Sequence, residues 1–156
     1  MSEKKHKLEL DVQYPDTRLE ASITPDMIER WVQPSLLGPA ELAIRFVDAA
    51  EGQVLNRDYR HKDYATNVLT FAYNEGEQLA DDEPVQADIV LCTDVLQREA
   101  EEQKKTVEEH VAHLVVHGVL HAQGYDHEHD EEAEEMEQLE RDIMEVLGYP
   151  DPYAEN

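Results

Sequence analysis

The chain has 156 residues, 40% of them hydrophobic, which allows one domain with a proper core and is too short for two, so residues 1–156 are expected to form a single domain. No apolar run approaches the roughly 18 residues of a membrane span, and the first residues lack the apolar core of a secretory signal. The single cysteine excludes an internal disulfide. We therefore expect a cytoplasmic protein with no membrane partner. The formal net charge is −24, and residues 71–156 hold 25 acidic against 4 basic residues, a field that argues against a polyanionic ligand unless a local basic patch or high salt intervenes.

The first part of the chain carries signals for two strands and a helix. Alternating apolar residues predict strands over Lys7–Tyr14 and Glu41–Val47. Between them, Thr24 is an N-cap residue and Pro25 suits the first helical position. This helix is expected to end or bend near Pro34.

The middle of the chain predicts one short helix, two strands and a loop. The helix is expected over residues 51–60. Asn67–Tyr73 and Asp88–Thr93 are short runs rich in Val, Ile, Leu and Phe, as in buried strands. Between these strands, Asn74–Pro84 is acidic and contains Gly and Pro, which is typical of an exposed loop.

The rest of the chain is expected to be mostly helical. One helix is predicted over Asp94–Lys104, and Thr106 with Glu109 three residues later begins the next. An amphipathic helix over residues 130–147 follows, with apolar residues at helical spacing. The predicted fold class is α+β, with a mixed sheet of about four strands packed with five to six helices and a central helix that carries a metal site.

The metal site is predicted from three histidines in HGVLHAQGYDH, residues 117–127. The i,i+4 step places His117 and His121 on one helical face, about one turn apart. Gly124 can adopt the left-handed conformation that ends a helix, and the returning chain brings His127 up as a third ligand. Three protein ligands leave one position open, which suits catalysis. Three imidazoles favour Zn²⁺, one ion per chain, although nickel, copper or iron could bind the same nitrogens.

The same spacing occurs in the zinc-peptidase signature HExxHxxGxxH, whose glutamate is the general base. In this chain Gly118 stands at that position, and a glycine cannot take a proton. A bound metal could lower the pKa of its water toward about 7 and so supply hydroxide without a dedicated base. It could also polarise a phosphoryl oxygen.

Several segments together resemble the YbeY family. They are LNRDYRHKDYATNVLTF (residues 55–71), ADIVLC (residues 87–92), HLVVHGVLHAQGYDH (residues 113–127) and the tail EEMEQLE with LGYPDPY (residues 134–140 and 147–153). These segments stand in the family's order and span most of the chain from about residue 40 to residue 153.

The resemblance implies a single-strand-specific, metal-dependent endoribonuclease. It further implies action in the maturation of the 3′ end of small-subunit (16S) ribosomal RNA and in ribosome quality control, with ribosomal RNA, the small ribosomal subunit and a ribosomal protein as partners. His117, His121 and His127 match the family's zinc ligands. Arg60 matches its functional arginine, and a guanidinium fits the oxygens of a scissile phosphate.

Two other functions stay open from the sequence. One is a non-enzymatic ribosome-assembly factor, in which zinc stabilises the fold and the acidic surface docks a ribosomal protein. The other is a metallopeptidase-like hydrolase, which would need a distant carboxylate as its base. His113, one turn before His117, is expected to support the site, since a fourth ligand would close it. The general acid or base and the oligomeric state do not follow from the sequence.

Overall fold

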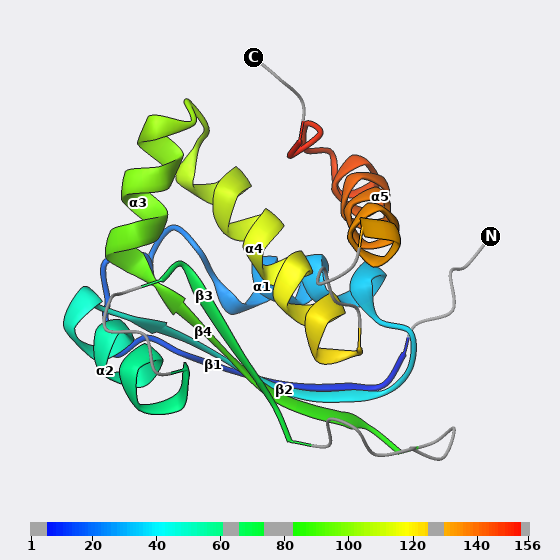
Figure 1. Ribbon diagram of the computed structural model, residues 1–156, viewed down its shortest axis with the longest axis horizontal. Coiled ribbons are helices and arrows are strands. Elements are labelled where there is room, and N and C mark those ends of the chain that lie inside the picture. The colour runs from blue at the N-terminus through cyan, green and yellow to red at the C-terminus, as the bar shows by residue number, and fades with distance from the viewer. Residues whose placement is uncertain (1–5, 61–65, 74–82, 125–129, 154–156) are drawn as a thin grey trace.

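Four strands form one mixed sheet in the computed structural model, which describes residues 6–60, 66–73, 83–124 and 130–153 (Figure 1). The strands are β1 (Leu8–Gln13), β2 (Ala40–Val47), β3 (Val68–Ala72) and β4 (Val85–Cys92). Their order across the sheet is β1-β2-β4-β3. The pairs β1–β2 and β2–β4 are parallel, and β3 runs antiparallel to β4 as an edge strand.

Five α-helices and one 3-10 turn complete the described fold. They are α1 (Pro25–Val32), η1 (Gln33–Ser35), α2 (Ala49–Arg60), α3 (Thr93–Glu102), α4 (Val107–Ala122) and α5 (Asp130–Leu147). The α+β prediction with a four-stranded mixed sheet is confirmed. Among these helices none has the length and apolar character that crossing a bilayer requires.

The predicted elements recur with small shifts at their ends. The largest shift concerns β4, which begins at Val85, three residues before the predicted start, because its first residues pair with those of β2 from Ala40 onward. Thr24 caps α1 as expected, since its Oγ1 accepts a hydrogen bond from the Met27 amide at 3.3 Å. Pro34 lies in the 3-10 turn that follows α1. Most of the predicted loop before β4 lies outside the described residues.

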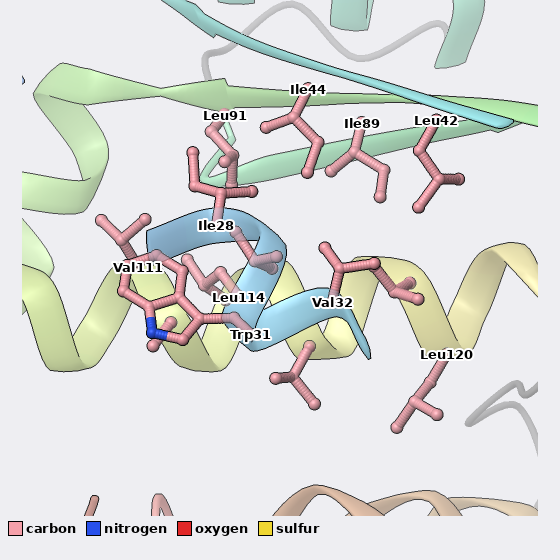
Figure 2. Packing of buried hydrophobic residues seen from close by; sticks show 14 of the residues in the cluster. Ile28, Trp31, Val32, Leu42, Ile44, Ile89, Leu91, Val111, Leu114 and Leu120 are labelled. Atoms are coloured by element: carbon pink, nitrogen blue, oxygen red, sulfur yellow. The ribbon is translucent and has the colours of Figure 1, made fainter. Parts of the chain in front are cut away.

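The core lies between the sheet and helices α1 and α4. Alternate residues of β2 and β4 point toward these helices, as the period of two along a strand requires. Figure 2 shows the contact layer, in which α1 supplies Ile28, Trp31 and Val32, the sheet supplies Leu42, Ile44, Ile89 and Leu91, and α4 supplies Val111, Leu114 and Leu120. Since α4 also contacts α3 and α5, it is the central helix.

The opposite face of the sheet is covered in part by α2. Leu55 of α2 packs on a small cluster formed by Val47, Leu69 and Val90. The helix lies close to the sheet at Gly52, where an added Cβ would stand 3.4 Å from Cys92 Sγ. Beyond α2 this face is open and acidic, with a hollow of about 450 Å³ lined in part by Glu9, Asp11, Glu41, Gln86 and Asp88.

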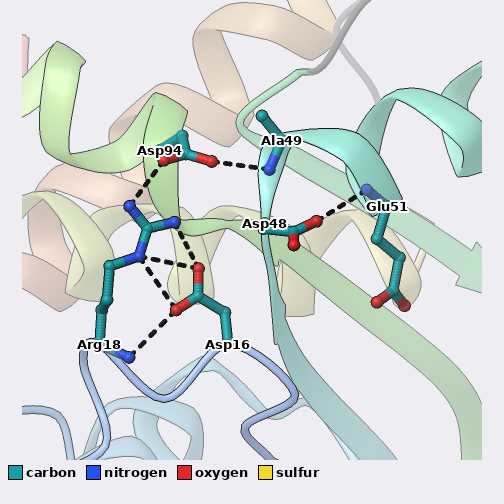
Figure 3. A network of polar contacts seen from close by, with 6 residues as sticks. All are labelled: Asp16, Arg18, Asp48, Ala49, Glu51 and Asp94. Atoms are coloured by element: carbon teal, nitrogen blue, oxygen red, sulfur yellow. Dashed lines mark hydrogen bonds and ion pairs between the residues drawn. The ribbon is translucent and has the colours of Figure 1, made fainter.

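A polar network holds the start of α2 in place (Figure 3). Arg18 forms ion pairs with Asp16 and, at 2.6 Å, with Asp94 at the start of α3. Asp94 in turn accepts a hydrogen bond from the Ala49 amide at 2.7 Å. The hydrogen bonds from Arg18 hold the pKa of both the Asp16 and the Asp94 carboxyl below the usual value.

Arg18→Gln is expected to lower the free energy of unfolding at pH 7 by about 1 kcal/mol, because the network is partly exposed and screened by solvent. A carboxyl whose pKa is lowered by folding contributes stability above its ordinary pKa, near 4, and loses it as the pH falls. The deficit of the variant should therefore shrink below about pH 4. Urea denaturation at pH 7 and pH 3 measures this.

The matched control for this prediction is Arg98→Gln. Arg98 lies on α3, and its contact with Glu102 is long and exposed, at 3.9 Å. This variant should unfold like the wild type at both pH values. An Arg18→Gln deficit that stayed constant between pH 7 and pH 3 would show that the carboxylates do not depend on Arg18.

Candidate functional site

Helix α4 carries two of the three candidate metal ligands, His117 and His121. Its first turn is capped by Thr106, whose Oγ1 accepts a hydrogen bond from the Glu109 amide at 3.1 Å. It ends at Ala122, and Gly124 follows with a φ of +105°. L-residues with a side chain rarely adopt that conformation, so the predicted left-handed turn at Gly124 is confirmed. Gly124 lies three residues after His121, which is the spacing in the motif.

His117 and His121 lie side by side on α4. Their ring centroids are 6.3 Å apart and the ring planes differ by 14°. The His117 side chain is 21% exposed, and His121 is also partly exposed. Two imidazoles at this spacing on one helical face are the donors that zinc takes in proteins.

Two of the four predicted site residues cannot be placed in full. His127 lies outside the described residues, and so does the Arg60 side chain, although its backbone forms the last residue of α2. Within the described ranges, no group of three His, Cys, Asp or Glu side chains is arranged to hold a metal ion. The third ligand therefore stays a prediction.

Glu140 of α5 is the site residue that sequence reasoning missed. Its side chain is buried, and Oε1 accepts hydrogen bonds from His113 Nε2 at 2.7 Å and from His117 Nδ1 at 3.1 Å. Its Oε2 accepts a third bond from the Tyr153 hydroxyl at 2.9 Å. Burial alone would raise the pKa of this carboxyl, but the hydrogen bonds from the two histidines outweigh it and lower the pKa to about 2. Glu140 is thus ionised at neutral pH.

The sequence held a signal for Glu140. In the last helix, Glu140 lies four residues after Met136 and four before Met144, and both methionines are buried. A residue at that spacing shares their face. A carboxylate on the buried face of an amphipathic helix is costly unless it is paired, which marks it as a residue with a partner.

His113 contacts the carboxylate that also faces His117, and its supporting role at the site stays a prediction. Its Nε2 faces Glu140, and its ring packs edge-on against the Tyr153 ring with centroids 5.3 Å apart. Because Nε2 of His113 is engaged by the carboxylate, this nitrogen is not available to a metal ion. The donor set of His117 and His121, with one imidazole oriented by a carboxylate, fits zinc.

Gly118 lies against the sheet and not toward the histidine face. A Cβ at this position would stand 3.0 Å from Ile89 Cγ2 and 3.5 Å from Thr70 Oγ1. The peptidase glutamate would therefore have to enter the packed layer between α4 and the sheet. A side chain at residue 118 would thus point away from the histidine face, which argues against the peptidase alternative.

Arg60 stands on the far side of the sheet from α4 in the chain's topology. Helix α2, which ends at Arg60, packs on the face opposite to α4 (Figure 1). The next described element is β3, and β3 is an edge strand. The backbone at residue 60 and the histidines of α4 therefore lie on opposite faces of the sheet. This separation was not predicted from the sequence.

Comparison with known proteins shows what the chain is similar to. Residues 6–148 match the family model described as "Endoribonuclease YbeY". Proteins named endoribonuclease YbeY from Herminiimonas arsenicoxydans and Janthinobacterium sp. (strain Marseille) are 64% and 67% identical, and the alignments cover 96% of this chain and 97% and 96% of theirs. The solution structure of a Thermotoga maritima protein has the same fold, with a TM-score of 0.54 at 23% identity over 94% of this chain and 99% of the other.

Proposed function

The chain belongs to the endoribonuclease YbeY family, and from this premise we propose that it is a zinc-dependent endoribonuclease that cuts single-stranded RNA. The observation that carries the proposal is the pair His117 and His121, side by side on the central helix and partly exposed. The two relatives named above, similar over nearly their whole length, carry the name of an RNA-cleaving enzyme. Together these support hydrolysis of an RNA phosphodiester bond.

In this proposal His117, His121 and His127 hold one zinc ion per chain. When bound, the ion supplies Lewis-acid chemistry to the phosphodiester at a position that three ligands leave open. The imidazoles bind and orient it, and Glu140 and His113 hold the His117 ring in place. Arg60 binds the scissile phosphate, because its planar fork of donors matches two phosphate oxygens.

We propose ribosomal RNA as the substrate, with cleavage at the 3′ end of small-subunit (16S) ribosomal RNA and in ribosome quality control. The small ribosomal subunit and a ribosomal protein would be partners in the cytoplasm. This part rests on the family resemblance. The open acidic face of the sheet is unsuited to RNA because its carboxylates repel phosphates, so RNA would approach from the histidine face.

A non-enzymatic assembly factor is the second candidate, because a net charge of −24 suits a basic protein partner better than RNA. In that case zinc would stabilise the fold and the acidic surface would bind the partner. The two candidates differ in one observable property. The enzyme cuts RNA without any ribosomal component, and the assembly factor does not.

The test of this proposal compares three substrates of one sequence: a single-stranded RNA, the same RNA in a duplex, and the matching single-stranded DNA. The zinc-loaded protein is expected to cut the single strand at least about tenfold faster than the duplex, since unpairing costs a few kcal/mol. Labelled fragments resolved on a denaturing gel give the rates. Equal cutting of strand and duplex, or no cutting of either, would contradict the proposal.

A further inference from the structure

The burial of the Glu140 carboxylate between two helices needs an explanation. Its exposed fraction is 0%, and it lies in the contact between α5 and α4. A buried carboxyl group is unfavourable unless its oxygens are engaged by hydrogen bonds. An apolar residue of similar size would pack this contact without that cost. Glu140 therefore has a role beyond filling space.

Among the described residues, the hydrogen bonds of Glu140 join it to two histidines of α4 and to a tyrosine near the end of the chain. Oε1 takes hydrogen bonds from His113 and His117, and Oε2 takes one from the Tyr153 hydroxyl. Tyr153 is itself held in place, because the Arg141 guanidinium lies 5.3 Å from its ring centroid. The carboxylate is thus fixed from both sides.

The contact with His117 determines which ring nitrogen can bind a metal. Nδ1 of His117 lies 3.1 Å from Oε1, and since a carboxylate only accepts hydrogen bonds, this contact favours the tautomer with the proton on Nδ1. In a neutral imidazole the other nitrogen, Nε2, then holds the lone pair. The ring is presented to an ion through Nε2, in one tautomer and one orientation.

We propose that Glu140 is a positioning residue of the metal centre, which holds His117 in the Nδ1–H tautomer so that Nε2 is ready for zinc, with Tyr153 and His113 keeping the carboxylate in place. This inference rests on the proposed function, since it assumes that His117 is a ligand. The carboxylate that orients an imidazole ligand also raises its basicity. The C-terminal segment is then part of the metal centre through its Tyr153 hydroxyl.

The first experiment compares the full-length wild type with Glu140→Gln. The amide keeps the size of the carboxylate, its oxygen can still accept from a histidine, and its NH₂ group can donate to the Tyr153 oxygen. Zinc affinity is measured by competition with a zinc-binding dye. Glu140→Gln is expected to bind zinc about 10- to 100-fold more weakly, while the zinc-free variant still melts cooperatively.

Two further variants make the result specific. Glu135→Gln removes the same charge from an exposed position on the same helix and should bind zinc as the wild type does. Tyr153→Phe removes only the hydroxyl and should weaken zinc binding in the same direction by a smaller factor. If Glu140→Gln does not fold, the Tyr153→Phe affinity carries the test, and wild-type affinity in that variant would overturn the proposal.

A second measurement does not depend on metal. In the zinc-free protein, ¹⁵N shifts of the His117 ring report its tautomer, which should be Nδ1–H in the wild type and mixed in Glu140→Gln. A merely structural role of Glu140 would leave the tautomer unchanged. Equal zinc affinity in the wild type and Glu140→Gln would overturn the inference and leave the proposed function intact, whereas a wild type that binds no zinc would overturn the proposed function.

Discussion

His121→Ala is expected to remove zinc and to reduce RNA cleavage by at least about 10³-fold, because the metal contributes several kcal/mol of transition-state stabilisation. The side chain is partly exposed near the end of α4, and alanine is the best helix former. The fold should therefore survive the change. A three-ligand site that loses one imidazole keeps too few ligands to hold zinc in competition with buffer.

The measurement combines three readouts on the wild type and the variant. Zinc per chain is counted by elemental analysis, folding is followed by circular dichroism, and cleavage is followed with a labelled single-stranded RNA. The wild type should hold about one zinc, since three ligands and one open position describe a single site. His6→Ala is the matched control, because it removes an imidazole at the opposite end of the chain, just before β1.

The outcomes of the His121 experiment separate the candidate functions. Zinc and cleavage both lost in a folded variant support the metal-dependent nuclease. Zinc lost with cleavage unchanged would assign the cleavage to another enzyme in the preparation and favour the assembly factor. Zinc retained at the wild-type level would remove His121 from the ligand set.

Arg60→Ala is expected to reduce cleavage by about 10²- to 10³-fold, the usual loss when one donor to a developing anion is removed. Zinc content should not change, because Arg60 is not a ligand. The size of this loss also tests a geometric point. Helix α2 packs on the face opposite to α4, so the loss tests whether residue 60 acts together with the histidines.

Arg57→Ala is the matched control for Arg60→Ala. Arg57 lies on the same helix, its side chain is 54% exposed, and it contacts the adjacent Asp58 at 3.3 Å. Each variant lowers the charge of an already acidic chain by one, so a general electrostatic effect on RNA would be the same in both. Arg141 would be a poor control, because its guanidinium lies over the Tyr153 ring.

Rates measured at two salt concentrations complete the comparison. A general charge effect weakens as salt screens it, whereas the loss of a direct phosphate contact in Arg60→Ala persists. Equal losses in Arg57→Ala and Arg60→Ala would show that residue 60 acts only through its charge. The prediction that Arg60 binds the scissile phosphate would then be wrong.

Much of the local structure of this protein could be predicted from short stretches of its sequence. The Thr24 and Thr106 caps, the strand alternation and the left-handed Gly124 all depend on neighbouring residues, and each is present as predicted. The i,i+4 step likewise placed His117 and His121 side by side. Such features follow from the periods of the helix and the strand, so a short window of sequence contains them.

The tertiary structure alone decided how these segments meet. Glu140 reaches His117 across 23 residues of sequence, and the Tyr153 hydroxyl joins from the end of the chain. Packing also placed Gly118 against Ile89 and set α2 on the face away from α4. These contacts join elements far apart in the chain, and which of them form depends on how the apolar faces of all the helices pack on the sheet at once, which no local spacing encodes.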